Sequence, residues 1–273
     1  MTAAQQARTT ARRAVHSKPL EWLTRAGFVG YGLLHILVAW IAVQIVRGQG
    51  GREGDQSGAF RTLAHQPGGG VLLVAVAVGL FAMAFWQLLT AAVGHLDKRG
   101  KRRVAERIAS LGRVVVYTAL GLGAAKVARG AEQSAAHSQQ SITAGFLGTP
   151  HGRMLIIVAG VVVAAVGIGL AIYGVTRAFE RNLRLAVMNE EMRAATRWLG
   201  GFGYAAKGSA YAIVGILLIV AAVTYDASKS RGLDAALHTL ARQPFGGVLV
   251  AIVALGFAAF GVYCFAQARY RKV

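Results

Sequence analysis

Two segments of the chain are nearly the same: residues 62–72 read TLAHQPGGGVL and residues 239–249 read TLARQPFGGVL. Nine of the eleven positions are identical. Pro67 and Pro244 therefore occupy the same place in two internal repeats, and Pro150 stands in the corresponding place before a third apolar run. Self-similarity of this kind is the signature of a fold built from one repeated unit. The sequence thus predicts three copies of one unit.

The apolar runs identify that unit as a membrane hairpin. Four runs contain no Asp, Glu, Lys or Arg and reach the roughly 20 residues that cross a bilayer. They cover residues 26–46, 68–94, 154–176 and 243–268. Two weaker runs, residues 114–125 and 208–225, reach that length once Arg113 and Lys207 are placed inside the membrane. We therefore expect an all-α, polytopic membrane protein with six transmembrane helices.

The first apolar run is expected to stay in the membrane as a signal anchor. It is longer than the apolar part of a secretory signal peptide and lacks a clear small-residue cleavage site. Cys264 is the single cysteine and lies inside the last run, which predicts no intramolecular disulfide and no redox motif. We expect no cofactor.

The basic residues indicate how the helices are oriented. Of the 30 Lys and Arg, 19 lie in residues 1–25, 98–107, 177–197 and 269–273, and eight lie in the three alternate loops. By the positive-inside rule, both termini and the two basic linkers are cytoplasmic. The net charge of +19 therefore follows membrane topology and does not indicate binding to nucleic acid. The bias towards Ala, Gly, Val and Arg is typical of a GC-rich bacterium and predicts a multi-pass protein of the bacterial plasma membrane.

These assignments divide the chain into five parts. They are a basic cytoplasmic tail (residues 1–20), repeat 1 (21–97), repeat 2 (98–177), a cytoplasmic amphipathic linker (178–196) and repeat 3 (197–273). Each repeat begins and ends in the cytoplasm, so all three have one orientation. This predicts a pseudo-threefold axis along the membrane normal, an arrangement of parallel repeats that occurs in transporters.

The linker is predicted to form one amphipathic helix. Phe179, Leu183 and Val187 recur on one side at helical spacing, and charged residues lie mostly elsewhere. Such a helix could lie on the membrane surface or dock a partner protein, and both interpretations stand.

The three prolines are predicted to start the second helix of each repeat, where a missing N–H does no harm. Ahead of two of them, residues 58–66 and 233–243 carry apolar residues at helical spacing and predict short interfacial helices on the outer face. The cytoplasmic border is predicted to carry a belt of aromatic side chains. These are Trp22, Trp86, Trp198 and Tyr263.

The repeats do not match the mitochondrial carriers, whose signature places an acidic residue two positions after each proline. The chain instead resembles the bacterial six-helix membrane proteins grouped as domain of unknown function 1206. The resemblance rests on RAGFVGYG at residues 25–32, GYAAKG at residues 203–208 and the LAxQP segments that begin at Leu63 and Leu240. The middle repeat departs from it, with FLGTP at residues 146–150. The resemblance implies three two-helix modules and implies no activity.

Polar residues occupy equivalent positions on one face of the first helix of each repeat, four residues apart along each helix. This polar stripe consists of Tyr31, Arg113, Lys207, His35, Tyr117 and Tyr211. Because equivalent residues lie at equivalent depths in a pseudo-threefold bundle, these side chains are predicted to face one another.

Arg113 and Lys207 make the polar stripe a candidate site. An ionisable group near the membrane centre costs at least about 2.5 kcal/mol and usually faces a bundle interior or water. The stripe would then line a cationic vestibule, open to the cytoplasm, for a small anion or a lipid headgroup. Alternatively, the two cations lie only about 9 Å inside the membrane and reach back to phospholipid phosphates.

Other chemistries lack the residues they need. The eleven acidic residues lie outside the uncharged runs or at their edges, which disfavours proton coupling and enzymatic activity. His35 is expected to bond to a neighbouring backbone carbonyl and not to relay protons. Four other histidines lack the close spacing of metal sites. These are His65, His137, His151 and His238.

Two functions follow as hypotheses. The first is a non-enzymatic membrane protein that binds or passes a small anion or a lipid headgroup. The second is a scaffold or accessory subunit that docks a membrane complex through its linker. The expected partners are the phospholipid bilayer, an anionic ligand or lipid, and a membrane protein.

Overall fold

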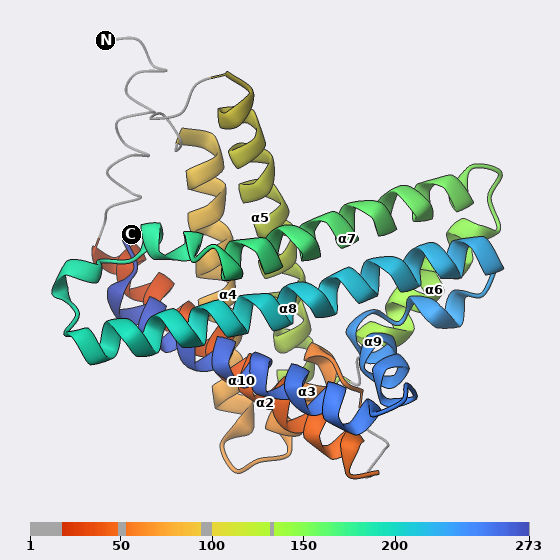
Figure 1. Cartoon of the computed structure of the whole chain (residues 1–273), viewed down its shortest axis with the longest axis horizontal. Helices are drawn as coiled ribbons and strands as arrows, with labels where there is room; N and C mark the ends of the chain where they lie inside the picture. Colours follow the sequence, from red (N-terminus) through yellow and green to blue (C-terminus); the bar gives the residue numbers. More distant parts are fainter. Residues whose placement is uncertain (1–17, 49–52, 94–99, 132–133, 273) are drawn as a thin grey trace.

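Six long α-helices form the bulk of the molecule (Figure 1). The computed structural model describes residues 18–48, 53–93, 100–131 and 134–272, so most of the basic tail and the start of the 98–107 loop lie outside the described residues. The long helices are α2 (Lys18–Val46), α4 (Gly69–Val93), α5 (Gly100–Ala128), α7 (Gly152–Val175), α8 (Glu190–Thr224) and α10 (Gly246–Tyr270). Each is long and apolar enough to cross a membrane, in agreement with the prediction of six. The described residues are all-helical apart from turns, loops and one isolated β-bridge.

Short helices precede the second long helix of every repeat. They are α3 (Gln56–Ala64), α6 (Ala135–Leu147) and α9 (Gly232–Ala241). The sequence predicts α3 and α9 but not α6, because residues 135–147 are mostly small or polar. The start of α6 is instead marked by Ser134, whose hydroxyl accepts a 2.8 Å hydrogen bond from the backbone N–H of His137.

Each proline lies two residues before its helix, in the turn that leads into α4, α7 or α10. In repeats 1 and 3 the next residue is left-handed, with φ of 74° at Gly68 and 60° at Phe245. In repeat 2 the same position is His151, with φ of −110°. The turn of the middle repeat therefore differs, as its divergent sequence suggests.

The two ends of the molecule differ. What we call the terminal end lies to the upper left of Figure 1. It holds the described residues nearest both termini, residues 176–189 between α7 and α8, the last turn of α4 and the first turn of α5. The three short helices α3, α6 and α9 lie at the opposite, distal end, to the lower right.

The closest packing joins helices of different repeats. The second helix of one repeat packs along the first helix of the next, so that α4 lies on α5, α7 on α8, and α10 on α2. Helices of the same repeat pack less extensively in the pairs α2 with α4 and α8 with α10. Among the described residues, α5 and α7, the two helices of the middle repeat, share at most marginal contact. The middle repeat is therefore held together through its neighbours.

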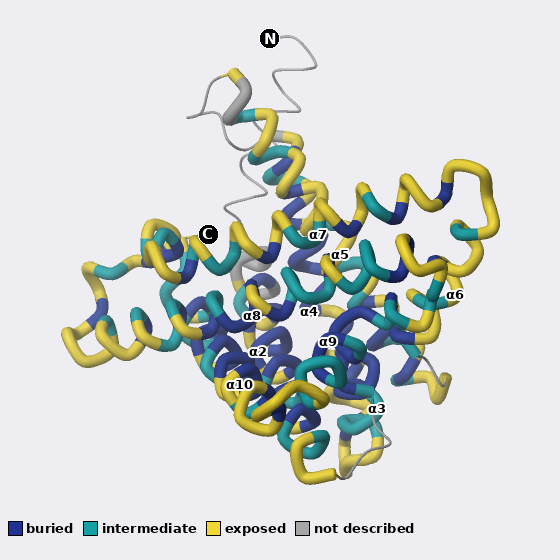
Figure 2. Tube along the Cα trace, turned by 45° about the vertical axis from the view of Figure 1, so that its right-hand side comes forward, coloured by how far each residue is buried: buried dark blue, intermediate teal, exposed yellow. Residues whose placement is uncertain are grey.

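Glycines allow α7 and α8 to approach closely. Gly160, Gly167 and Gly174 recur every seven residues on α7 and face glycines of α8 that also recur every seven residues. A Cβ on Gly167 would collide with the backbone of Gly208 and Ala212. Small residues thus let the backbones of this pair of helices come into contact. The opposite face of α7 is largely exposed and apolar, which suits contact with lipid (Figure 2).

The linker does not form the predicted amphipathic helix. Two 3₁₀ turns, η1 (Ala178–Asn182) and η2 (Leu185–Val187), are followed directly by α8. Two backbone hydrogen bonds pin the linker to the end of the chain: Arg184 N–H donates to Tyr270 O at 2.8 Å, and Lys272 N–H donates to Asn182 O at 2.9 Å. This β-bridge competes with helix formation because it fixes an extended backbone between the two turns.

The apolar linker residues and the aromatic belt also differ from the prediction. Phe179 and Leu183 are buried in the core, whereas Val187 is exposed. Of the belt, Trp22 and Trp198 are exposed, but Trp86 and Tyr263 are 7% and 0% exposed. The last two therefore pack between helices and do not face lipid.

Candidate functional site

Lys207 is a buried cation among aromatic rings. It is 4% exposed, and its Nζ donates a 2.6 Å hydrogen bond to the hydroxyl of Tyr31, which comes from α2. The same Nζ lies 4.1 Å from the ring centroid of Phe260, 4.7 Å from that of Tyr31 and 5.6 Å from that of Tyr211. Among the described residues no acidic side chain forms an ion pair with it. A hydroxyl and the faces of three rings therefore hold the cation.

His35 and Tyr117 extend this group. His35 is 2% exposed, and its Nδ1 lies 2.8 Å from the carbonyl oxygen of Tyr31. A carbonyl only accepts, so Nδ1 carries the proton, and the predicted histidine-to-backbone bond is confirmed. The ring centroid of Tyr31 lies 4.4 Å from that of His35 and 5.8 Å from that of Tyr117.

Five of the six residues of the polar stripe thus meet at one place, and they come from α2, α5 and α8. We call Tyr31, His35, Tyr117, Lys207, Tyr211 and Phe260 the central cluster. The sequence predicts a vestibule here, but the rings pack directly on the cation. The ring closest to the Lys207 ammonium group is that of Phe260, which lies on α10, the second helix of repeat 3. This ring occupies the place where the predicted vestibule would lie between the first helices of the three repeats.

Arg113 is the sixth residue of the polar stripe and stands apart. It is exposed and forms no ion pair or hydrogen bond with another described residue. Lys126, near the distal end of the same helix, is also exposed. Both cations are free to extend towards lipid headgroups, as the alternative interpretation of the polar stripe predicts for Arg113.

Aromatic residues whose grouping the sequence did not predict continue the central cluster towards the terminal end. The ring of Tyr204 lies 5.0 Å from Phe260 and 5.6 Å from Phe179, and Phe179 lies 5.2 Å from Tyr263. The signal was the aromatic spacing of three residues at positions 257, 260 and 263 on α10.

Arg271, at the end of α10, is a second cation that the sequence analysis missed. Its guanidinium lies 4.9 Å from the ring centroid of Phe28 and 5.2 Å from that of Trp86. Arg271 Nε and Trp86 Nε1 are both buried donors without an acceptor among the described residues. Two donors without acceptors beside one another leave hydrogen-bonding capacity for an anion or water at the terminal end.

The distal end holds buried carboxylates that serve structure. Asp234 is 2% exposed; its carboxylate accepts the N–H of Gly54 at 2.9 Å and lies 3.2 Å from Arg231. Asp55 caps α3 by accepting the N–H groups of Ser57 and Gly58, and burial raises the pKa of its carboxyl to about 6.

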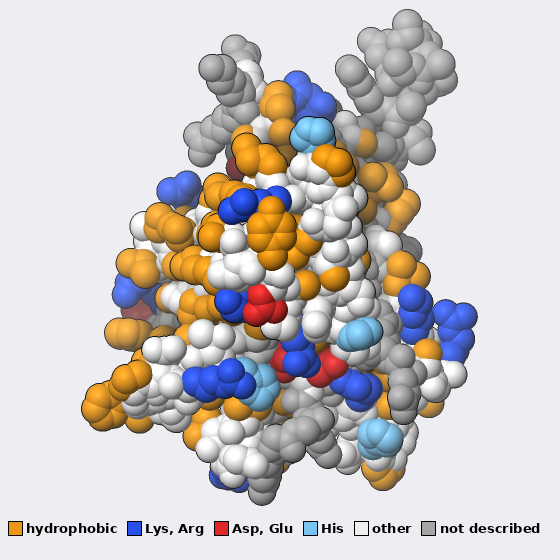
Figure 3. Space-filling view, turned by 90° about the vertical axis from the view of Figure 1, so that its right-hand side faces the viewer, with side chains coloured by type: hydrophobic (Ala, Val, Ile, Leu, Met, Phe, Trp, Pro, Cys, Tyr) orange, Lys and Arg blue, Asp and Glu red, His pale blue; other side chains and the backbone are white. Residues whose placement is uncertain are grey.

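Histidines at this end do not form a metal site in the described part of the chain, where no group of three or more suitable ligands occurs. Charged and histidine side chains gather across the middle and lower part of the view in Figure 3. Three of the four histidines considered above are exposed, namely His65, His137 and His151, and His238 lies 3.5 Å from Asp234.

Comparison with known proteins gives a family but no activity. The family model described as Domain of Unknown Function (DUF1206) matches three times, at residues 26–94, 108–177 and 202–271, which confirms the internal triplication. An uncharacterized protein of Bacillus subtilis (strain 168), YxxB, is 32% identical over 258 residues, which cover 92% of each chain. No solved structure matches the chain.

Proposed function

This chain belongs to the DUF1206 family, and we propose that it is a non-enzymatic membrane protein that binds a small anion or an anionic lipid headgroup. The central cluster is the proposed site, and Lys207 is its principal cation.

One observation carries the proposal. Lys207 lies inside a membrane-spanning helix with a single hydrogen bond to a described residue and no carboxylate partner there. An ammonium group has three N–H donors, and a charge placed inside the membrane usually marks a functional site. An anion that enters between the rings of Tyr31 and Phe260 would supply the missing acceptor. Binding would therefore require these rings to separate.

Arg271 and Trp86 support an anion-binding role at the terminal end. Their buried donors lack acceptors in the described residues, and a phosphate or carboxylate would satisfy both. Arg271 follows directly on the last residue of α10, a position where lipid headgroups lie if α10 spans the membrane. In this proposal Arg271 and Trp86 would contact the anion first, at the terminal end, and Lys207 would bind it deeper in the membrane.

The proposed orientation places the terminal end in the cytoplasm of a bacterial cell, with both termini inside. The positive-inside distribution of Lys and Arg supports it, and the Bacillus relative supports a bacterial membrane. We further propose a pseudo-threefold arrangement. It is supported by the pairing of each second helix with the next first helix, including the return of α10 to α2.

The scaffold hypothesis has less support, because the linker that was expected to dock a partner is pinned to the end of the chain.

The test is ligand-induced stabilisation of the purified protein in mild detergent. We expect short-chain phosphatidylglycerol or inorganic phosphate to raise the melting temperature of the wild type, and short-chain phosphatidylcholine to have little effect. Lys207→Met removes the cation while keeping a similar volume, so the variant should fold and lose the stabilisation.

Lys126→Met is the matched control, because Lys126 is an exposed lysine of another spanning helix, α5. It should respond to phosphatidylglycerol as the wild type does. An equal response of the wild type and Lys207→Met to every probe would disprove a binding role for Lys207.

A further inference from the structure

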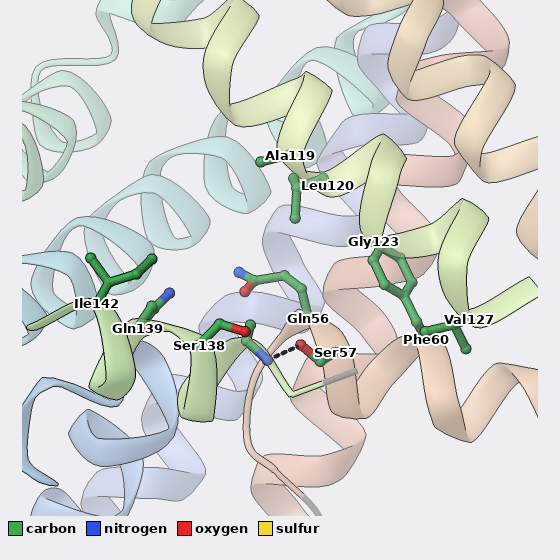
Figure 4. Close-up of a pocket in the computed structure, with 11 residues that line it drawn as sticks. Gln56, Ser57, Phe60, Ala119, Leu120, Gly123, Val127, Ser138, Gln139 and Ile142 are labelled. Carbon is green, nitrogen blue, oxygen red and sulfur yellow. Dashed lines mark hydrogen bonds between the residues drawn. The ribbon is translucent and has the colours of Figure 1, made fainter. Parts of the chain in front are cut away.

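A cavity of about 220 Å³ lies near the distal end, between α3, α5 and α6 (Figure 4). Residues 119–127 of α5 form one wall, and this stretch is the distal part of a predicted membrane span. On α5 the lining begins at Ala119, two residues after Tyr117, but it contains no residue of the central cluster. It is a separate space.

The lining divides into a polar and an apolar part. Figure 4 shows Gln56, Ser138 and Gln139 together on one side of the cavity, and Phe60 and Val127 on the other. None of the eleven lining residues is charged. They are Gln56, Ser57, Phe60, Ala119, Leu120, Gly123, Val127, Ala135, Ser138, Gln139 and Ile142.

The polar side has free hydrogen-bonding capacity. The amide groups of Gln56 and Gln139 form no hydrogen bond with another described residue. Ser57 Oγ accepts the N–H of Ala135 at 2.8 Å, which leaves its own O–H to donate. Ser138 Oγ donates to the carbonyl of Ser134 at 2.8 Å, which leaves its oxygen to accept. Donors and acceptors are therefore both available, and without a charge they suit a neutral polar group.

The apolar side lies within reach of the bilayer. Leu122 and Val116 lie on α5, the helix that carries Leu120 and Val127, and are 47% and 49% exposed. Because α5 and α7 pack at most marginally, no long helix of the middle repeat covers this side of α5 in the described structure. An alkyl chain could therefore enter from the lipid.

We propose that this cavity binds a neutral single-chain lipid, with hydroxyl groups of its head on Gln56, Ser138 and Gln139 and its alkyl chain along Phe60, Leu120 and Val127. The volume of the cavity favours a lipid with one alkyl chain, because it is below the roughly 300–1,000 Å³ of sites that enclose a drug-sized ligand. The rest of the chain extends into the bilayer. None of the lining residues in the described part of the chain is charged, which favours an uncharged head over a phosphate.

The test uses a photoreactive monoacylglycerol with a diazirine in its chain, added to the full-length protein in lipid nanodiscs. Label should concentrate on peptides that contain residues 119–127 and 138–142, and excess unlabelled monoacylglycerol should compete. A lysophosphatidic acid with the same photoreactive chain should label these peptides several-fold less.

Two variants with a matched control decide the result. Gly123→Leu fills the cavity from α5 and should abolish competable labelling, whereas Gly112→Leu, on the same helix where no atom lies within 4 Å of the added Cβ, should leave it unchanged. If Gly123→Leu does not fold, Gln56→Leu combined with Gln139→Leu decides, with labelling expected to fall about tenfold for the loss of two hydrogen bonds.

Labelling spread evenly over α5, α6 and α7, or unchanged in the folded variants, would overturn the proposal. So would equal labelling by lysophosphatidic acid. Lys207→Met separates this proposal from the anion site, because it should leave monoacylglycerol labelling intact whether or not Lys207 binds an anion. Loss of labelling in that folded variant would show that the cavity is not a separate site.

Discussion

Lys207 shows how a cation can stay inside a membrane protein without a carboxylate. Burying a lysine at the centre of a membrane helix costs about 2.5–3.5 kcal/mol on insertion scales. A desolvated cation–π contact contributes about 2 kcal/mol, and a hydrogen bond to a charged group about 1.5–3 kcal/mol. The Tyr31 hydroxyl and the rings of Tyr31, Phe260 and Tyr211 therefore offset the penalty. The cluster can hold the charge before any ligand arrives.

Asp55 should make the stability of the distal end depend on pH. Burial raises the pKa of its carboxyl from 3.8 to about 6, so the folded state binds this proton more tightly than the unfolded state. The resulting stabilisation is complete below the unfolded pKa and is lost as the pH rises through about 6; it amounts to at most about 3 kcal/mol. We expect the melting temperature in detergent to fall between about pH 4 and pH 7 through this group.

The variant Asp55→Asn isolates the contribution of this carboxyl. Asparagine keeps a side-chain oxygen that can cap α3 but does not titrate. The melting temperature of the variant should therefore fall less than that of the wild type over the same range. Parallel curves for the two proteins would show that Asp55 does not titrate in this window.

At the scale of elements, the contact between α7 and α8 depends on glycine. A side chain on Gly167 would meet the backbone of α8, whereas one on Gly169, two residues further along α7, would meet nothing within 4 Å. We expect Gly167→Leu to destabilise the protein by about 1–3 kcal/mol or more, as overpacking does, and to lower its melting temperature in detergent. Gly169→Leu is the control and should melt like the wild type; equal losses would contradict close packing at Gly167.

The sequence predicts the long helices well because each is defined by its own residues. Uncharged runs of membrane length need no information from elsewhere in the chain. The prediction of an amphipathic linker helix was wrong because the structure of this segment depends on distant residues. Phe179 and Leu183 do have helical spacing, but they are buried against residues that are remote in sequence. Pairing with Tyr270 and Lys272 then fixes an extended backbone. Local periodicity contains no information about a segment so distant in the sequence.

At the scale of the whole molecule, the repeat explains which site residues could be found. Equivalent positions of three repeats would lie at similar depth in a pseudo-threefold bundle, so the sequence predicts that Tyr31, Tyr117 and Lys207 face one another. The structure brings these three residues together. Phe260 and Arg271 were missed, because their place depends on how α10 packs across the junction between repeats 3 and 1. That packing is not encoded in any single repeat.

The proposed orientation predicts where reporter proteins work. With the chain expressed in a Gram-negative host, green fluorescent protein fused after Lys272 should fluoresce, because that end would be cytoplasmic. Alkaline phosphatase fused after Ala64 should be active, because α3 would lie outside the membrane. The opposite pattern would reverse the orientation, and the anion would then approach from outside the cell.

The pairing of α10 with α2 also has a consequence for biosynthesis. The pairs α4 with α5 and α7 with α8 join neighbours in the chain and can assemble as soon as the ribosome has delivered them. In contrast, α2 can complete its packing only after α10 has been translated, because α10 is its main partner and follows the other five long helices in the chain. Until then Tyr31 and His35 remain uncovered in the bilayer, without the rings of α10 around them. A chain truncated before α10 should therefore be a substrate for membrane proteases, even though five of its six spans are complete.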